Sequence, residues 1–251
     1  EPEMTHSFEV GIEARFLKNR IGLNATFYKT NTRNQFFKLP TLSGDKYAYR
    51  YVNAGDIQNV GWEISLDAVP LLTNHFKWKT EVNFSTNRNK IISLHEALKE
   101  FLYGPTSFSS SYAMKLVKGG SIGDMYGKAF VRDDAGKIVY GTEGENTGMP
   151  LVEGDGNTVK VGNANPKLIL GWNHMLSYKN FSFYFLVDCR FGGDILSQTQ
   201  AAMDMYGVSS VTARARDTGY VMLEGNRRDN VQGFYKNVVG GRAGGTEYYM
   251  Y

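Results

Sequence analysis

Side chains that can do chemistry are sparse and scattered in this 251-residue chain. The single cysteine, Cys189, excludes an internal disulfide and any zinc cluster of the CxxC type. No GxSxG nucleophile elbow and no P-loop occurs. None of the four histidines has the HxxxH or HExxH spacing of metal ligands, and the four are His6, His75, His95 and His174. We therefore expect no catalytic residues, no cofactor and no metal centre, and the chain is not predicted to be an enzyme.

Three polar segments have simple interpretations as surface structure. Residues Glu153–Asn157 are rich in oxygen ligands but lack the EF-hand spacing, so a polar turn is favoured over a calcium site. Residues Asp133–Lys137 have the composition of a tight turn. Pairs of arginines occur at 214/216 and 227/228, but carboxylates follow within a few residues. Together with a net charge of only +3, this predicts no nucleic-acid partner.

Tyrosines in the long connections are the candidates for ligand binding. Aromatic platforms beside amides and carboxylates are suited to binding sugars. Aromatic side chains in loops also pack against one another and order those loops, and this alternative stays open. The four candidate ligand-binding residues are Tyr103, Tyr112, Tyr126 and Tyr206.

The elements that would position these side chains are β-strands. The chain has 28 glycines, 16 tyrosines and 15 phenylalanines but only 42% hydrophobic residues, a composition that favours β structure. Apolar and polar residues alternate with period two in long segments, as they do in strands with two different faces. Three hairpins are predicted, pairing residues 8–16 with 21–28, 61–68 with 76–85, and the strand that begins at residue 168 and turns at 178–180 with 181–191.

The connections are very unequal in length. Short turns are predicted at Leu17–Arg20, Pro70–His75 and Tyr178–Asn180. Residues 29–60 are expected to extend their strands as a tall hairpin. Short helices are expected around Leu94–Phe101 and Gln198–Met205. Short turns at one end and long loops at the other are typical of an outer-membrane barrel.

Two kinds of sheet fit the alternation: a soluble sandwich and a membrane barrel wall. The strand length of about 9–11 residues favours a transmembrane strand. Aromatic residues near the ends of the apolar stripes suggest interfacial girdles. The polar faces carry charges of both signs, as a hydrated lumen allows, at Glu9, Glu13, Arg15, Glu63, Asp67, Lys79 and Glu81. We predict an all-β fold, an antiparallel transmembrane β-barrel segment of about six strands that is an incomplete barrel. The alternatives are a soluble carbohydrate-binding β-sandwich and a β-rich glycoside hydrolase.

Short motifs in a fixed order over residues 3–195 add a family resemblance. They are Glu3-x-Thr5-x-Ser7-x-Glu9-x-Gly11, Phe27-Tyr28-x-Thr30, Asn53-x-Gly55, Asn59-x-Gly61-x-Glu63, Gly123-x-x-Tyr126-Gly127, Gly162-Asn163-x-x-Pro166, Tyr178-Lys179-Asn180-Phe181 and Asp188-x-x-x-Gly192-Gly193. In this combination the chain resembles the SusC/RagA family of TonB-linked (TonB-dependent) outer-membrane transporters.

The resemblance implies that residues 1–251 belong to the receptor's β-barrel domain, in its C-terminal half, with the plug domain and final strands outside this chain. It implies a bacterial outer-membrane location, with lipid around the barrel. It further implies import of an oligomeric nutrient, a glycan or sometimes a peptide, under a SusD-type surface lipoprotein. Energy would come from TonB through N-terminal parts. The short turns would face the periplasm and the long connections the exterior.

Overall fold

The computed structural model describes residues 2–40, 46–47, 49–94, 100–103, 112–144, 147–153 and 159–235. The chain divides into two compact units. The first contains residues 1–104, 114–125 and 162–194, and the second contains residues 105–113, 126–161 and 195–251.

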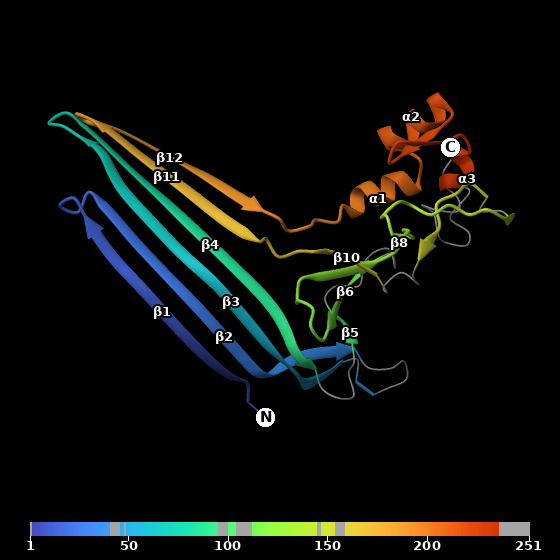
Figure 1. Ribbon diagram of the computed structural model, residues 1–251, viewed down its shortest axis with the longest axis horizontal. Helices are drawn as coiled ribbons and strands as arrows, with labels where there is room; N and C mark the ends of the chain where they lie inside the picture. Colours follow the sequence, from blue (N-terminus) through green and yellow to red (C-terminus); the bar gives the residue numbers. More distant parts are fainter. Residues whose placement is uncertain are drawn as a thin grey trace. The chain divides into compact units, whose positions relative to one another are not determined.

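A six-stranded antiparallel sheet forms most of the first unit, in the order β1-β2-β3-β4-β11-β12 (Figure 1). Its strands are β1 (Met4–Phe16), β2 (Ile21–Pro40), β3 (Tyr49–Leu72), β4 (Phe76–Leu94), β11 (Leu168–Tyr178) and β12 (Phe181–Phe191). The three predicted hairpins are therefore confirmed. Within the described residues, no strand joins β1 to β12, so the sheet is a segment of wall and not a closed barrel.

Short turns join the strands of each hairpin, as expected. Leu17, Lys18 and Asn19 all adopt positive φ in the first turn, at 52°, 57° and 65°. The second turn is shorter than the predicted Pro70–His75, because β3 continues to Leu72. Pro70 is tolerated inside that strand because the register between β3 and β4 shifts between Ala68 and Leu71, where no ladder bond is needed.

At the opposite end, β2 and β3 extend far past their neighbours. They contain 20 and 24 residues, or about 65–80 Å at roughly 3.3 Å per residue. The tall hairpin predicted for residues 29–60 is thus confirmed. A buried apolar cluster stabilises this extension, and its members are Phe37, Ile57, Ile91 and Leu116.

One face of the large sheet is apolar and exposed. Phe8, Ile12 and Phe181 are 62%, 63% and 80% exposed. In a soluble sandwich this face would pack against a second sheet. In a membrane barrel it contacts lipid. The exposed apolar face is therefore that of a barrel wall.

A smaller sheet has the order β10-β7-β6-β5. Its strands are β5 (Glu100–Tyr103), β6 (Tyr112–Val117), β7 (Asp124–Gly127) and β10 (Val159–Asn163). The helix expected around Leu94–Phe101 is wrong at both ends, since Leu94 ends β4 and Phe101 lies in β5. Residues 95–99 lie outside the described residues.

The described residues of the second unit form three short helices, α1 (Gln198–Met205), α2 (Ser210–Thr218) and α3 (Val231–Phe234). It also has two small hairpin-like pairs, β8 (Ala129–Phe130) with β9 (Val152–Glu153), and β13 (Val221–Leu223) with β14 (Asn226–Arg228). The helix α1 has the predicted bounds. Ser197 and Ser209 cap α1 and α2 by accepting backbone N–H bonds. The core of this unit is formed by Met149, Ala215, Val231, Phe234 and Tyr235.

Among the described residues, no helix is both long and apolar enough to cross a membrane.

Candidate functional site

The polar face of the large sheet brings charged side chains from separate strands into rows. One row crosses the sheet from Arg15 through Gly22 and Asp67 to Glu81. The next row along contains Glu13, Asn24, Ser65 and Asn83. These rows follow from period-two alternation once the register is set, because paired residues point to the same face.

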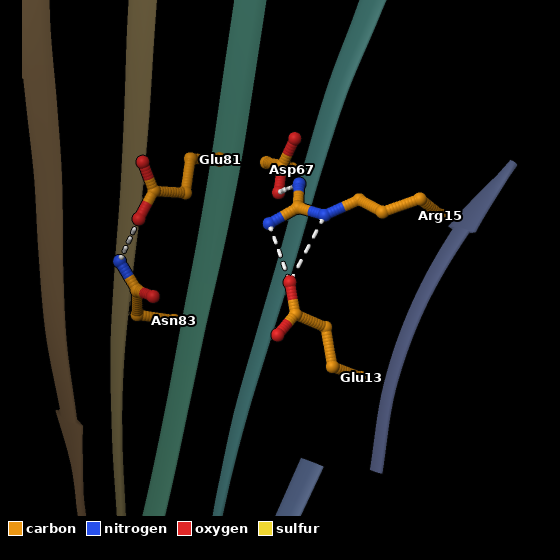
Figure 2. Close-up of polar contacts among 5 residues, drawn as sticks. All are labelled: Glu13, Arg15, Asp67, Glu81 and Asn83. Carbon is orange, nitrogen blue, oxygen red and sulfur yellow. Dashed lines mark hydrogen bonds and ion pairs between the residues drawn. The ribbon is translucent and has the colours of Figure 1, made fainter. Parts of the chain in front are cut away.

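Figure 2 shows the contacts in these two rows. Arg15 Nη1 donates to Asp67 Oδ1 at 2.8 Å, while Arg15 Nη2 and Nε lie 3.3 and 3.4 Å from Glu13 Oε1. Asn83 Nδ2 donates to Glu81 Oε1 at 3.0 Å. The Arg15 side chain is 41% exposed, so each ion pair stabilises the fold by only about 0.2–1 kcal/mol. The contacts orient these charged groups, and the wall they line remains hydrated.

Gly22 makes the Arg15–Asp67 pair possible. It stands on β2 between the two strands that carry the charges, and the ion pair passes over it. A Cβ on Gly22 would lie 2.8 Å from Arg15 Cζ and closer still to Arg15 Nη1 and Asp67 Oδ1. A glycine here therefore lets a side chain contact the strand beyond its neighbour.

Gly61 serves a similar contact nearer the other end of the sheet. Tyr28 reaches across Gly61 of β3, and its hydroxyl donates to the Thr86 carbonyl of β4 at 3.3 Å. A Cβ on Gly61 would lie 2.5 Å from Tyr28 Oη and would overlap the Thr86 carbonyl oxygen. The Asn59-x-Gly61-x-Glu63 motif thus includes a residue whose lack of a side chain is required by close packing.

A cleft opens where β4 and β11 separate. Their last pair is Ser85 with Ile169, and β4 next finds partners at Ile91, which bonds to the backbone of Gly119 and Gly120. The cleft between these points has a volume of about 730 Å³. It is lined by Val60, Gly61, Trp62, Thr86, Asn87, Arg88, Asn89, Ser121, Asn163, Asn165, Pro166, Lys167, Gly192, Gly193 and Asp194.

Amide and carboxylate side chains order the backbone around this cleft. Asn89 Oδ1 accepts from the Ile122 amide at 2.9 Å. Asn163 Nδ2 donates to the buried Asp124 at 2.6 Å, and the Asn163 amide donates to Asp194 Oδ2 at 2.8 Å. Asn87 and Asn89, on the polar face of β4, offer donors and acceptors that suit sugar hydroxyls and peptide groups alike.

The sequence did not predict the cleft. Five segments of the chain form it, namely residues 60–62, 86–89, 121, 163–167 and 192–194, and the motif Gly162-Asn163-x-x-Pro166 supplies part of one of them. That motif and the alternating asparagines at 87 and 89 were the available signals.

The four tyrosines proposed as ligand-binding residues lie on different elements. Tyr126 is a half-buried residue of β7, and Tyr206 caps the C-terminal end of α1 and is 45% exposed. Tyr103 and Tyr112 belong to β5 and β6, but their side chains lie outside the described residues. Their role in ligand binding stays a prediction.

The polar segments outside the sheet fit the expectation of surface structure where they are described. Asp133 Oδ1 accepts from the amides of Ala135 and Lys137 at 3.0 and 2.8 Å, which confirms the tight turn. Residues 154–158 of the acidic segment lie outside the described residues. Among the described residues, no cluster of three or more His, Cys, Asp or Glu side chains is placed to hold a metal ion.

Arg227 and Arg228 of the second unit have local partners. Arg227 forms an ion pair with Asp229, and the Arg228 guanidinium stacks 3.6 Å from the Tyr140 ring centroid. Arg132 forms a two-point ion pair with Glu224, with oxygen distances of 3.1 and 2.6 Å. Their mutual hydrogen bond raises the pKa of Arg132 and lowers the pKa of Glu224.

His174 illustrates the apolar face of the sheet. Its Nδ1 accepts a hydrogen bond from Trp78 Nε1 at 3.2 Å, and its ring stacks on Phe185 with centroids 4.6 Å apart. Trp172 packs against a further side at 4.5 Å. With only 7% of its surface exposed, His174 is packed among these aromatic side chains.

The fold and the two faces of the sheet define a class: the wall of a transmembrane β-barrel with a polar lumen. Residues 1–93 match the family model described as "TonB dependent receptor-like, beta-barrel". The chain is 26% identical to TonB-dependent receptor P3 of Formosa agariphila over 78% of its own length and 21% of that protein. It is also 26% identical to TonB-dependent receptor SusC of Bacteroides thetaiotaomicron, over 73% of this chain and 19% of that protein.

A solved structure shares the fold. The structure titled "Structure of the RagAB peptide transporter" has a TM-score of 0.64 at 17% identity, covering 82% of this chain and 23% of that one. These similarities support the SusC/RagA family of TonB-dependent outer-membrane receptors, and the chain spans about a fifth of the length of these relatives. These relatives are named as receptors and a transporter, not as enzymes, and the family resides in the outer membrane.

Proposed function

We propose that this chain contributes barrel wall and external connections to a TonB-dependent importer of oligomeric nutrients. In this proposal, residues 1–251 all belong to the barrel domain of a longer receptor. The observation that carries it is the two-faced sheet: an exposed apolar face on strands of membrane-spanning length, and a hydrated, charged face opposite. The similarity to a family of receptors supports the assignment to transport.

The substrate class that we propose is a glycan, with a peptide as the other candidate. Four asparagines line the cleft, and Asn87 and Asn165 among them offer both donors and acceptors. Such groups bind sugar hydroxyls well, and they also pair with peptide backbone. The peptide alternative draws on the fold shared with the RagAB peptide transporter.

The partners that we propose are TonB, which would act through parts of the receptor outside this chain, and a SusD-type lipoprotein above the barrel. The end of the sheet opposite the short turns would face the exterior, as in other outer-membrane barrels. The lid would then meet the long connections of residues 29–60, 88–166 and 192–250.

Uptake by living cells tests this function. A strain without the receptor gene is complemented with the wild-type receptor or with a receptor that lacks its TonB-engaging segment, and is offered labelled oligosaccharides or labelled oligopeptides. We expect one of the two labels to enter only with the wild-type receptor, and a surface lipoprotein to co-purify with it. Equal uptake of both labels in all three strains would contradict the proposal.

A further inference from the structure

Cations replace apolar residues on the outer face of the sheet, just beyond the apolar region. Lys29 and Arg88 flank Val60 in one row across β2, β3 and β4. Lys90 lies in the next row, and Arg33 follows along β2. All four cationic side chains are exposed. The other members of the rows of Lys29, Arg88 and Lys90 carry no carboxylate, and they are Phe8, Val60, His6, Asn31 and Gln58. Arg33 pairs with Met4 of β1, and Asp56 follows Gln58 on the same face of β3, where the register between β2 and β3 shifts.

These four cations, which we call the outer basic rows, differ from the cations of the polar face. On the polar face Arg15 is paired with both Asp67 and Glu13. Within the described part of the chain, none of the four side chains of the outer basic rows takes part in an ion pair or a side-chain hydrogen bond. Four exposed positive charges that form no ion pair stand on one face, and such a cluster attracts an anion.

The outer basic rows stand next to an aromatic pair. Phe27 and Trp62 pack with ring centroids 5.1 Å apart, and Trp62 is 49% exposed on the outer face. Barrels carry such aromatic girdles where hydrocarbon meets headgroups. The row of Lys29 and Arg88 follows two residues later on the same face, or about 6.6 Å along the strand. The cations therefore stand at headgroup level, at the end of the sheet opposite the short turns.

The cleft between β4 and β11 opens beside these cations. Trp62 and Arg88, which belong to the outer face, are among its lining residues, as is Lys167. One carboxylate, Asp194, also lines the cleft, but its Oδ2 already accepts the Asn163 amide at 2.8 Å.

We propose that the outer basic rows bind the phosphate groups of a phosphorylated glycolipid in the outer leaflet of the outer membrane. An exposed guanidinium forms paired hydrogen bonds with a phosphate, and the lysines add charge around it. The acyl chains would then lie along the apolar face below Trp62. The inference rests on the proposed place of this sheet in the barrel wall, and it does not depend on which nutrient is imported.

The test compares two double variants of the complete receptor. Arg88→Gln with Lys90→Gln removes two outer cations. Lys77→Gln with Lys79→Gln is the matched control, because it removes two cations with the same spacing from the opposite face of the same strand. Purified receptors in nanodiscs of phosphatidylcholine are titrated with bisphosphorylated lipid A, with dephosphorylated lipid A, or with inorganic phosphate, and bound lipid is counted by native mass spectrometry.

We expect the double variant Arg88→Gln with Lys90→Gln to bind bisphosphorylated lipid A about tenfold more weakly than wild type. Each cation near a membrane surface raises the affinity for an anionic lipid roughly fivefold, and the two remaining cations retain part of the affinity that the two substitutions remove. The control should bind as wild type does, and dephosphorylated lipid A should bind weakly to all three. Equal binding by both double variants would overturn the proposal. Displacement of lipid A by millimolar inorganic phosphate would overturn the choice of lipid. Lipid binding is measured without a nutrient, so its outcome is distinguishable from a failure of transport.

Discussion

Replacing Gly61 with alanine should destabilise the barrel far more than replacing Gly22, although both glycines let a side chain cross a strand. At Gly61 the new Cβ overlaps the Thr86 carbonyl, which is backbone of the paired strand, and it lies 2.5 Å from Tyr28 Oη. Real Cβ atoms do not approach closer than about 3.0 Å. At Gly22 the nearest atoms are the far ends of two flexible side chains, Arg15 and Asp67.

The magnitudes follow from what must move. Gly61→Ala forces β3 and β4 apart and costs about 1–3 kcal/mol as overpacking. It also breaks the Tyr28–Thr86 hydrogen bond, which stabilises by about 0.5–1.5 kcal/mol. Alanine regains about 0.5–1 kcal/mol over glycine in a strand, so the net loss is about 0.5–4 kcal/mol. For Gly22→Ala the same gain offsets the lost Arg15–Asp67 pair, worth about 0.2–1 kcal/mol, so the net change is near zero.

Urea unfolding of the complete receptor in detergent micelles measures both effects, with tryptophan fluorescence as the signal. We expect the midpoint to fall clearly for Gly61→Ala and to stay within error for Gly22→Ala. Tyr28→Phe alone should lower it slightly, and should have no further effect in the Gly61→Ala background. If Gly22→Ala were as destabilising as Gly61→Ala, the distinction between side-chain and backbone overlap would be refuted.

Two further predictions concern the faces of the sheet and the second unit. Ile12→Lys places a charge on the lipid face and should destabilise the folded receptor by about 2–4 kcal/mol near the membrane centre, while Thr26→Lys on the polar face should destabilise it by under about 0.5 kcal/mol. The yield of folded receptor in the outer membrane compares the two variants. Spin labels at Ile12 and Phe185 should be quenched only by a lipid-soluble reagent. Burial, with a smaller contribution from Asp204, raises the pKa of Tyr235 above its ordinary 10.0. The unfolded phenol therefore ionises first as pH rises past 10, and the second unit loses stability there. Tyr235→Phe should abolish this loss of stability. The measurement is the alkaline hydrogen-exchange rate of amides 231–235, corrected for intrinsic rates. If the variant lost stability at alkaline pH as the wild type does, Tyr235 would be excluded as the source.

Strands and hairpins were predictable because the period-two pattern is local. Each strand of the large sheet carries its own alternation, and the turn residues between paired strands are few. The error around Leu94–Phe101 has a physical cause. Residues 94, 97, 98 and 101 have helical spacing. However, Leu94 of β4 pairs with Gly55 of β3, and this non-local pairing overrides the local pattern.

The candidate site was much less predictable, because it depends on register. Arg15 and Asp67 are 52 residues apart and are not even on adjacent strands. The cleft could be predicted only if it were known that the pairing between β4 and β11 stops at Ser85 and Ile169. Alternation predicts which face a residue is on, but it does not predict how far two strands remain paired.

The positions of the cations mark where the hydrocarbon ends. On the outer face of β4, Trp78, Val82 and Phe84 precede Arg88 and Lys90, whereas the cations near the short turn, at 77 and 79, point to the polar face.

The same change occurs on β2, where Phe27 is followed on the outer face by Lys29 and then Arg33. Because Lys29 and Arg88 occupy one row, the change falls at the same register position on both strands. A solvated outer face would have no reason to exclude lysine from one end only. A charge in hydrocarbon costs several kcal/mol, so the cations appear on the outer face only where the strands leave the lipid.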